Sequence, residues 1–470
     1  MKKFSYILAA AMVGVSLAAC NDDHKPDWSE TEPFDVAVTS VSIADGATVS
    51  ASTNNIEVVY SHDVVLNSLA SITLTNSEIN SVEIKDGNTL VATFNLSKGE
   101  RYTFNIPANA VAGIGSKTFA PEVTVTFSTE GSGATQIINP SLVSPQLMTP
   151  FASEEATKVY SVLLENYGKK QLSGAMGDVA WNTAFCDLIH DATGKYPAIV
   201  GFDYIHLASS PANWIDYGDI TPVQKVWEAG SLPAMTWHWN VPKSENGTDS
   251  GFSASDTEFK ASNVLIDGTW ENQVATADVE KLAGYLTLLQ DAGIPVLWRP
   301  FHEAAGDYTW GAWFWWGNSG VETTKQLWYW LREKLINEYG LKNLIWVWTV
   351  QTSDEGKLAP LSKLQEAYPG DDAVDIIGAD LYEEALSNHT DQFELLYNLV
   401  EGRRMVALTE CGNLLEVDKA FSEGALWSYF MGWYDMNDSG QFGFHQWNTN
   451  NEWKTILDNP LVINRGDVTF

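Results

Sequence analysis

Two glutamates, Glu303 and Glu410, follow apolar runs that have the composition of buried strands. The runs are IPVLWRPFH before Glu303 and MVALT before Glu410. Parallel α/β proteins gather their chemistry at the C-terminal ends of the strands, so these two carboxyl groups are expected to converge. A converging pair suits retaining glycoside hydrolysis, in which one carboxyl group protonates the leaving oxygen and the other attacks the anomeric carbon. The spacing leaves other pairs open, because Asp203 and Asp380 also end apolar runs.

The stretch around Glu303 combines charge with an unusual density of aromatic residues. Arg299 and His302 precede the glutamate, and four Trp lie within residues 310–316. Aromatic faces can stack on pyranose rings, and surroundings of low polarity raise the pKa of a carboxyl group, which suits Glu303 to donating a proton. The alternative interpretation is a core strand followed by a loop whose aromatic residues serve packing.

Other polar and aromatic side chains end the remaining apolar runs. His238 lies between two Trp in TWHWN, and Tyr382 ends VDIIGADLY. Either residue could instead belong to the core with its polar atoms satisfied. Arg299 is better explained as an ion-pair partner that braces the second carboxylate than as a sugar contact, while Trp348 and Asp203 are equally compatible with packing and with a site. Further residues at predicted strand ends are His206, His445, Gln446 and Trp447.

The elements that would bring these residues together occupy residues 135–470. Eight apolar runs alternate there with amphipathic stretches such as 276–293, in which Val279, Leu282 and Leu286 share one face. Their number and the length of the region predict an α/β fold, a (β/α)8 TIM barrel. A doubly wound sheet is the alternative, but neither a GxGxxG fingerprint nor a phosphate loop occurs. The runs are 170–177, 198–206, 232–240, 294–303, 344–350, 374–382, 405–412 and 442–448.

Residues 35–130 differ in texture, because they show no helical periodicity. Seven short runs of alternating residues are separated by turn residues, a pattern that predicts a small all-β sandwich of immunoglobulin type. The region resembles bacterial Ig-like spacer domains that end in a TVTFST strand. Its outward residues are mostly Ser, Thr and Asn without an aromatic cluster, so a spacer is favoured over a sugar-binding module. The runs are 36–43, 55–61, 71–76, 81–86, 89–96, 101–107 and 122–129.

The N-terminus has the pattern of a targeting segment. Two lysines precede an apolar stretch at residues 7–17, and LAAC then ends at Cys20. This resembles a bacterial lipoprotein signal, residues 1–19, that is cut before Cys20, where the lipid anchor to the membrane is attached. Acidic residues soon after the cysteine resemble the export tag of surface-displayed lipoproteins in Bacteroidetes-type bacteria. We therefore expect an outer membrane lipoprotein exposed at the cell surface, with residues 20–34 as a tether; a periplasm-facing anchor is the alternative.

Composition narrows the classes of partner. A formal net charge of −33 argues against nucleic acid and against anionic membrane surfaces, and it is compatible with a neutral substrate. The 20 Trp fit a carbohydrate-binding cleft, although a large Trp-rich core would look similar. Cys186 and Cys411 are expected to be free buried thiols, although their pairing cannot be deduced from sequence. No cluster of Cys or His has metal-ligand spacing, so no metal or other cofactor is expected. The sequence also contains no apolar stripe that would require a partner chain, so a monomer is expected.

Three motifs closely resemble those of glycoside hydrolase family 26, the β-mannanases of the large retaining-barrel clan. They are WRPFHE ending at Glu303, WFWWG beginning at Trp313, and TECG around Glu410. A His directly before the acid/base glutamate distinguishes this family from clan relatives that carry Asn there. The resemblance covers about residues 140–465, and it implies Glu303 as the acid/base and Glu410 as the nucleophile.

The resemblance also implies polar contacts around the reacting sugar. His302 would hold the nucleophile or the region of the 2-hydroxyl group. Tyr382 would donate a hydrogen bond to the nucleophile, and His238 would contact the sugar on the non-reducing side.

The implied aromatic contacts lie on either side of the cleavage point. Trp313 would stack near that point, and Trp447 would floor the subsite in which the bond breaks. The link from Glu303 to Trp313 is longer than the short Gly-rich link usual in the family. Trp310 and Tyr308 within it are therefore expected to form an additional aromatic lip.

The resemblance implies an endo-acting β-1,4-mannanase that hydrolyses mannan, galactomannan or glucomannan by double displacement. Within the same chemistry, β-1,3-linked xylan and mixed-linkage β-glucan are alternative substrates. A non-catalytic surface glycan-binding lipoprotein is an alternative of another class. Such a protein would be expected to have lost one of the two carboxylates, and both Glu303 and Glu410 are present.

Overall fold

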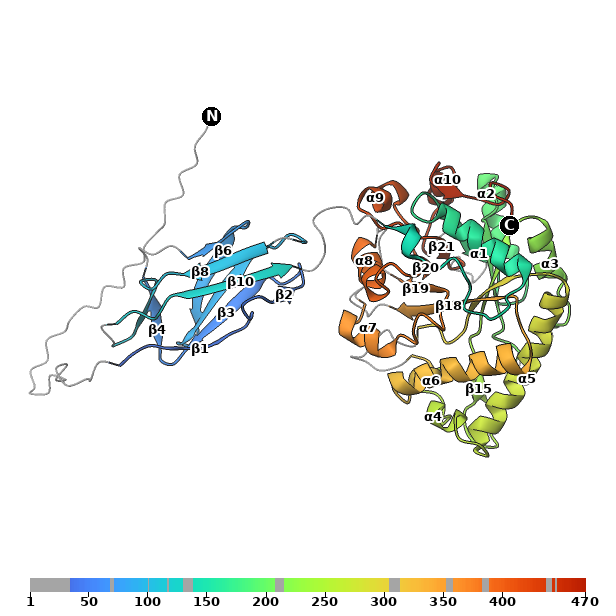
Figure 1. The fold of residues 1–470 in the computed structure, drawn as a ribbon, viewed down its shortest axis with the longest axis horizontal. Coiled ribbons are helices and arrows are strands. Elements are labelled where there is room, and N and C mark those ends of the chain that lie inside the picture. Colours follow the sequence, from blue (N-terminus) through green and yellow to red (C-terminus); the bar gives the residue numbers. More distant parts are fainter. Residues whose placement is uncertain are drawn as a thin grey trace, which may run out of the picture. The chain divides into compact units, whose positions relative to one another are not determined.

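Eight parallel strands close into a barrel in the C-terminal part of the computed structural model, and an all-β sandwich precedes it (Figure 1). Both predicted fold classes are therefore confirmed. The chain divides into two compact units, one up to residue 133 and one from residue 134. The structure describes residues 34–470 except 68–71, 100, 116–117, 130–137, 208–214, 304–312, 352–357, 383–388, 437–441 and 444–445.

Every barrel strand is buried along its whole length. This burial on both faces explains why the strands read as continuous apolar runs rather than as alternating ones. Neighbouring strands pair in parallel around the closed ring. The strands are β12 (Gly174–Met176), β13 (Ile199–Asp203), β14 (Leu232–Thr236), β17 (Val296–Arg299), β18 (Leu344–Gln351), β19 (Ile376–Leu381), β20 (Met405–Cys411) and β21 (Phe430–Gly432).

Helices cover the outside of the barrel (Figure 1). The predicted amphipathic helix is α5, which begins after Thr269, whose hydroxyl caps it, and buries Val279, Leu282 and Leu286. Among the described residues, no helix is long and apolar enough to cross a membrane. The helices are α1 (Glu154–Asn166), α2 (Ala184–Thr193), α3 (Thr221–Glu228), α4 (Ala261–Val264), α5 (Trp270–Asp291), α6 (Val321–Arg332), α7 (Leu361–Ala367), α8 (Thr390–Leu399), α9 (Val417–Ser422) and α10 (Asn450–Leu457).

The eighth barrel strand lies elsewhere than the sequence predicted. β21 closes the ring between β20 and β12, whereas the described residues of run 442–448 belong to the connection after it and contribute no barrel strand. The prediction was wrong because β21 has only three residues and ends in Gly432. A Cβ at Gly432 would come within 2.9 Å of the Trp453 ring, so a small residue is required in a strand that consequently gives a weak signal.

A short parallel pair joins the two ends of the barrel region. β11 (Gln171–Leu172), near the start of the region, pairs with β22 (Val462–Ile463), close to the C-terminus. The barrel ring itself closes nearby, where β12 pairs with β21 through Ala175 and Gly432. Residues 462–463 therefore complete a structure that residues 171–172 begin.

The N-terminal unit is a two-sheet sandwich with its own apolar core. One sheet has the order β1-β3-β7-β6 and the other β2-β10-β8-β5, while β4 and β9 form a separate pair. The alternating burial of strands such as β8 and β10 is the expected pattern for strands with one face in the core. The strands are β1 (Val38–Val41), β2 (Thr48–Val49), β3 (Asn55–Tyr60), β4 (Val64–Leu66), β5 (Thr73–Leu74), β6 (Ile79–Lys85), β7 (Thr89–Phe94), β8 (Arg101–Ile106), β9 (Val111–Gly113) and β10 (Val123–Thr129).

The two cysteines of the barrel region are buried and free, as expected. Cys186 lies on α2, and Cys411 is the last residue of β20. Burial raises the pKa of both thiols, that of Cys186 to about 12. Both side chains therefore act as small apolar residues of the core.

Candidate active site

Glu410 lies near the C-terminal end of β20 and is held by side chains from two other strands. Arg299, the last residue of β17, donates a hydrogen bond from Nη2 to Oε2 of Glu410. Tyr382, which follows β19, donates its hydroxyl hydrogen to Oε1 of the same carboxylate. Because a donor engages each oxygen, the carboxylate is fixed in one orientation, as an attacking group requires.

Arg299 links two carboxylates at the top of the barrel. Its side chain is buried and also donates from Nη1 to Asp380 Oδ2 at 2.5 Å and from Nε to Thr236 Oγ1 at 3.2 Å. The ion pair with Glu410 is the bracing contact that the sequence suggested for Arg299. Removing one member of a buried pair typically costs about 3–5 kcal/mol, so this arginine contributes to both the stability and the shape of the site.

Glu303 stands on a strained turn that follows β17. Phe301 and Glu303 have φ angles of 49° and 57°, in the left-handed region, where each non-Gly residue costs about 1–3 kcal/mol. Burial raises the pKa of Glu303 well above its ordinary value, and the neighbouring carboxylates of Asp380 and Glu410 raise it further against the opposing effect of Arg299. This is the direction expected from the sequence, and it favours the protonated form of Glu303, the form that a general acid needs.

His238 and His302 form a buried pair beside Glu303. Their Nε2 atoms lie 3.1 Å apart and share a hydrogen bond. Burial, His238 and Arg299 all lower the pKa of His302, which lies well below its ordinary value. Burial also lowers the pKa of His238, but the Asp203 carboxylate outweighs this and the net shift is upward. Among the described residues, no hydrogen bond joins His302 to Glu410, so the contact with the nucleophile expected from the resemblance is not observed.

Trp447 reaches the site although it does not belong to a barrel strand. Its ring lies against Gly412 and meets the Tyr382 ring edge-on, with centroids 5.4 Å apart. Its backbone N–H donates to Oδ1 of the buried Asp435 at 2.8 Å, which anchors the connection that carries it. Trp447 therefore lies beside Tyr382, the residue whose hydroxyl group holds the Glu410 carboxylate.

Trp433 is an aromatic residue of the site that sequence reasoning missed. It directly follows β21 and is half-buried, and its ring centroid lies 5.9 Å from that of His238. Phe314 and Phe252 approach the same histidine at 5.6 Å and 5.4 Å. The signal for Trp433 was its place just after a barrel strand, and the wrong position of the eighth strand concealed it.

Gln351 was also missed. It ends β18 in register with Asp380, and residues paired between parallel strands point to the same face, so its side chain points into the barrel. Gln351 is 3% exposed, and its buried Oε1 has no hydrogen-bond partner among the described residues. A free amide oxygen at the end of a barrel strand can accept a hydrogen bond from a substrate hydroxyl group.

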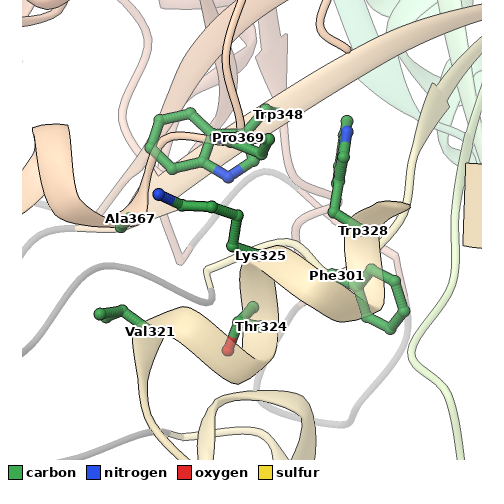
Figure 2. Close-up of a pocket in the computed structure, with 8 residues that line it drawn as sticks. All are labelled: Phe301, Val321, Thr324, Lys325, Trp328, Trp348, Ala367 and Pro369. Carbon is green, nitrogen blue, oxygen red and sulfur yellow. The ribbon is translucent and has the colours of Figure 1, made fainter. Parts of the chain in front are cut away.

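Trp348, for which packing and site were equally compatible, packs outside the barrel. Its ring meets that of Tyr368 with centroids 5.3 Å apart. Figure 2 shows that Trp348 lines a small pocket together with Lys325 of α6. The other residues that line this pocket are Phe301, Val321, Thr324, Trp328, Ala367 and Pro369.

The aromatic run after Glu303 divides into packing and exposed residues. Trp315 and Trp316 are completely buried, so the packing interpretation holds for them. Trp313 is 38% exposed and available to a ligand, but the structure gives it no ring contact with the described side chains of the site. The predicted residues Cys20, Tyr308, Trp310 and His445 lie outside the described residues.

Gly412→Ala is expected to lower kcat/KM tenfold or more, because displacement of about 1 Å in an active site can cost about 10²-fold. A Cβ at this position would lie 2.6 Å from Cε3 of Trp447, so the rigid indole must move. Gly284→Ala in α5 is the control, since a Cβ there meets nothing within 4 Å. Steady-state kinetics with thermal melting would separate the two effects, and unchanged kinetics for Gly412→Ala would mean that the position of Trp447 is unimportant.

The arrangement supports chemistry by two carboxyl groups. Glu303 can give up a proton, Glu410 is oriented for attack, and the two carboxyl groups are close enough for Glu410 to raise the pKa of Glu303. Among the residues that the structure describes, no group of three or more His, Cys, Asp or Glu side chains is placed to hold a metal ion.

Two family models match the chain. The model described as glycosyl hydrolase family 26 matches residues 148–467, and the model described as a bacterial Ig-like domain matches residues 30–129. The first match includes the barrel and the side chains that meet around Glu410.

Characterised relatives agree with the family match. Mannan endo-1,4-β-mannosidase B of Piromyces sp. is 34% identical over 301 residues, which are 62% of this chain and 49% of that protein. The matched part of the chain spans about half the length of the two curated mannosidases of Piromyces sp..

Solved structures show the same barrel. The family 26 domain of an endo-β-mannanase/endo-β-glucanase from Prevotella bryantii is 39% identical with a TM-score of 0.61, covering 69% of this chain and 99% of that domain. A β-mannanase from a symbiotic protist of the termite Reticulitermes speratus, solved with a gluco-manno-oligosaccharide, is 35% identical with a TM-score of 0.59, covering 69% and 98% of the two chains. Motifs, site geometry and comparisons agree: the chain belongs to glycoside hydrolase family 26.

Proposed function

We propose that this chain is a retaining endo-β-1,4-mannanase that acts on mannan, galactomannan or glucomannan. The observation that carries the proposal is that two carboxyl groups have different surroundings, one suited to attack and the other to proton donation. Glu410 has each oxygen engaged by Arg299 or Tyr382, whereas Glu303 has a raised pKa. Two carboxyl groups set apart in this way are the signature of an acid/base and a nucleophile. The relatives named mannan endo-1,4-β-mannosidases support the choice of backbone.

The geometry supports a double displacement. Glu303 gives its proton to the glycosidic oxygen while Glu410 attacks the anomeric carbon, so the leaving chain departs as an alcohol and a glycosyl–enzyme ester forms. Glu303, now ionised, takes a proton from water, and that water attacks the anomeric carbon, so the bond from this carbon to the Glu410 oxygen breaks and the Glu410 carboxylate is released. Tyr382 keeps the reacting oxygens of Glu410 in place, and Trp447 and Trp433 offer aromatic faces to the sugar.

Analysis of products tests the proposal. The protein from residue 21 onward would be incubated with unbranched mannan, galactomannan, glucomannan, mixed-linkage β-glucan and β-1,3-xylan. A ladder of manno-oligosaccharides from the mannans is expected. Mannobiose as the sole product would mean that the enzyme acts in the exo mode instead of the endo mode. Products from only glucan or xylan would mean that the substrate is not mannan, while the roles of the two glutamates would stand. Binding without any product would favour the non-catalytic glycan-binding alternative.

We further propose that the protein is a lipoprotein anchored through Cys20 to the outer membrane, exposed at the cell surface. The LAAC motif and the acidic residues that follow support this location. Cys20→Ala is expected to prevent lipidation and to shift the protein from the membrane fraction to the soluble one. Protease treatment of intact cells distinguishes the two faces, since a periplasm-facing anchor would leave the protein protected.

A further inference from the structure

Three side chains from three strand ends form a hydrogen-bonded chain that leads to the residue before Glu303. Asp203, the last residue of β13, accepts from the backbone N–H of His238 at 3.0 Å and from its Nδ1 at 2.5 Å. His238 in turn meets His302 through the two Nε2 atoms. The side chain of Asp203 is completely buried, that of His238 is 13% exposed, and His302 is 1% exposed.

The chain has a defined hydrogen-bond direction. As a carboxylate, Asp203 can only accept, so His238 carries a proton on Nδ1 and presents Nε2 to His302. His302 Nδ1 is buried, and no described residue forms a hydrogen bond with it. A buried lone pair without a partner costs less than a buried N–H without one, so His302 carries its proton on Nε2 and donates it to His238.

His302 lies between two strained residues. Phe301 and Glu303 on either side of it have left-handed backbones, which persist only where their surroundings hold them. The carbonyl oxygen of His302 accepts from Trp316 Nε1 at 2.9 Å, and its ring is bonded to His238. The middle residue of the strained turn is therefore fixed both by its backbone and by its side chain.

We propose that Asp203 is a positioning residue for the acid/base Glu303, acting through His238 and His302 to hold the strained turn in its productive conformation. The inference rests on the proposed function, in which Glu303 protonates the leaving group. The side chain of Asp203 is hydrogen-bonded to His238 and acts on Glu303 only through the two histidines, so its effect is confined to the steps that Glu303 carries out.

Asp203→Asn tests the proposal with little change in volume. The amide oxygen can still accept from the backbone N–H of His238, but the amide nitrogen cannot accept from Nδ1. His238 must then carry its proton on Nε2, where it meets the proton on His302 Nε2, so the link between the rings is lost unless His302 buries an unpaired N–H. We expect kcat/KM on the polysaccharide to fall about ten- to hundredfold, less than the full 10²–10⁴-fold of general acid catalysis.

The diagnostic readout is dependence on the leaving group. A dinitrophenyl glycoside needs no protonation, so Asp203→Asn is expected to leave its kcat/KM within about twofold of wild type, whereas a phenyl glycoside should lose activity as the polysaccharide does. In a Glu303→Ala background, adding Asp203→Asn should change the phenyl glycoside rate no further, because residues acting as one unit are not additive. Equal losses on both glycosides, or additive losses in the double variant, would overturn the proposal.

Asp278→Asn is the matched control. Asp278 lies on α5 and accepts a hydrogen bond at 2.8 Å from Nε1 of Trp239, a residue just beyond β14. Its carboxyl group is largely buried, and burial raises its pKa to about 7. Asp278 has no hydrogen bond to His238 or His302, so any activity that Asp278→Asn loses should be lost equally on the dinitrophenyl and the phenyl glycoside. A larger loss on the phenyl glycoside, as expected for Asp203→Asn, would overturn the proposal. Cleavage of mannan by the wild type tests the proposed function separately. The Asp203→Asn variant is compared with the wild type on whichever polysaccharide the wild type cleaves, so a different substrate would not affect this test.

Discussion

Glu410→Gly is expected to lower kcat on every substrate by about 10⁴-fold or more, the scale seen when a nucleophile is removed. Without this carboxylate, no covalent glycosyl–enzyme can form, and a better leaving group does not help because the attacking atom is missing. Adding azide should restore turnover of an activated glycoside. Azide would attack from the face that Glu410 vacates, so the product would be a glycosyl azide of inverted anomeric configuration, identified by NMR.

The configuration of that product decides the assignment. A retained glycosyl azide from Glu410→Gly would show that another carboxylate is the nucleophile, and Asp380 would be the first to examine. Thermal melting of the variant is needed as a control, since Arg299 loses one of its two buried anionic partners. Asp380 remains as a counter-ion, so the variant is expected to fold.

Glu303→Ala is expected to abolish most activity on polysaccharide, by about 10²–10⁴-fold, while activity on a dinitrophenyl glycoside is largely kept in the first step. The second step also needs Glu303 as a base, so the glycosyl–enzyme should accumulate and KM should fall. A burst of dinitrophenolate followed by slow turnover, with a covalent adduct seen by mass spectrometry, would show this. Azide should accelerate turnover and give a product of retained configuration, opposite to that from Glu410→Gly. Equal losses on both substrates would contradict the acid/base role.

The raised pKa of Glu303 also predicts a pH dependence. Activity on polysaccharide should fall as pH rises through this pKa, because the proton to be donated is then lost. The folded-state pKa lies above the unfolded one, so the stability contribution of this group is fully present below the unfolded pKa and is lost as pH rises through the folded pKa. Glu303→Gln should therefore raise the melting temperature more at alkaline than at acidic pH, and an equal effect at both would contradict the raised pKa.

Much of the fold could be predicted because burial leaves a strong pattern. Seven of the eight barrel strands follow apolar runs long enough to stand out, and α5 has a clear apolar face. The eighth strand escaped because three buried residues carry little signal, while the run 442–448 imitates alternation in a connection. Strand length alone did not decide which strands could be recognised, because β12 also has only three residues; it was found within the predicted run 170–177, which also contains β11.

The residues of the site were predictable where their role depends on residue type, and less predictable where their role depends on the direction in which the side chain points. Glu303 and Glu410 stand at strand ends, and their convergence follows from the barrel alone. The direction of a side chain can be assigned only when the strand register is known. The observed register places Gln351 inside the barrel and Trp348 outside it. The bond between His238 and His302 joins two strands, so no spacing within the sequence could reveal it.

The pairing of β11 with β22 bears on how the protein is made. The chain is synthesised from its N-terminus, but the partner of residues 171–172 is the far later pair of residues 462–463. The ring closes late too, since β21 follows more than two hundred residues after β12. Long-range pairings of this kind make folding slow and leave apolar strands exposed meanwhile. The barrel can therefore complete its folding only after residues 462–463 have been released, whereas the sandwich, with its own core, can fold earlier in synthesis.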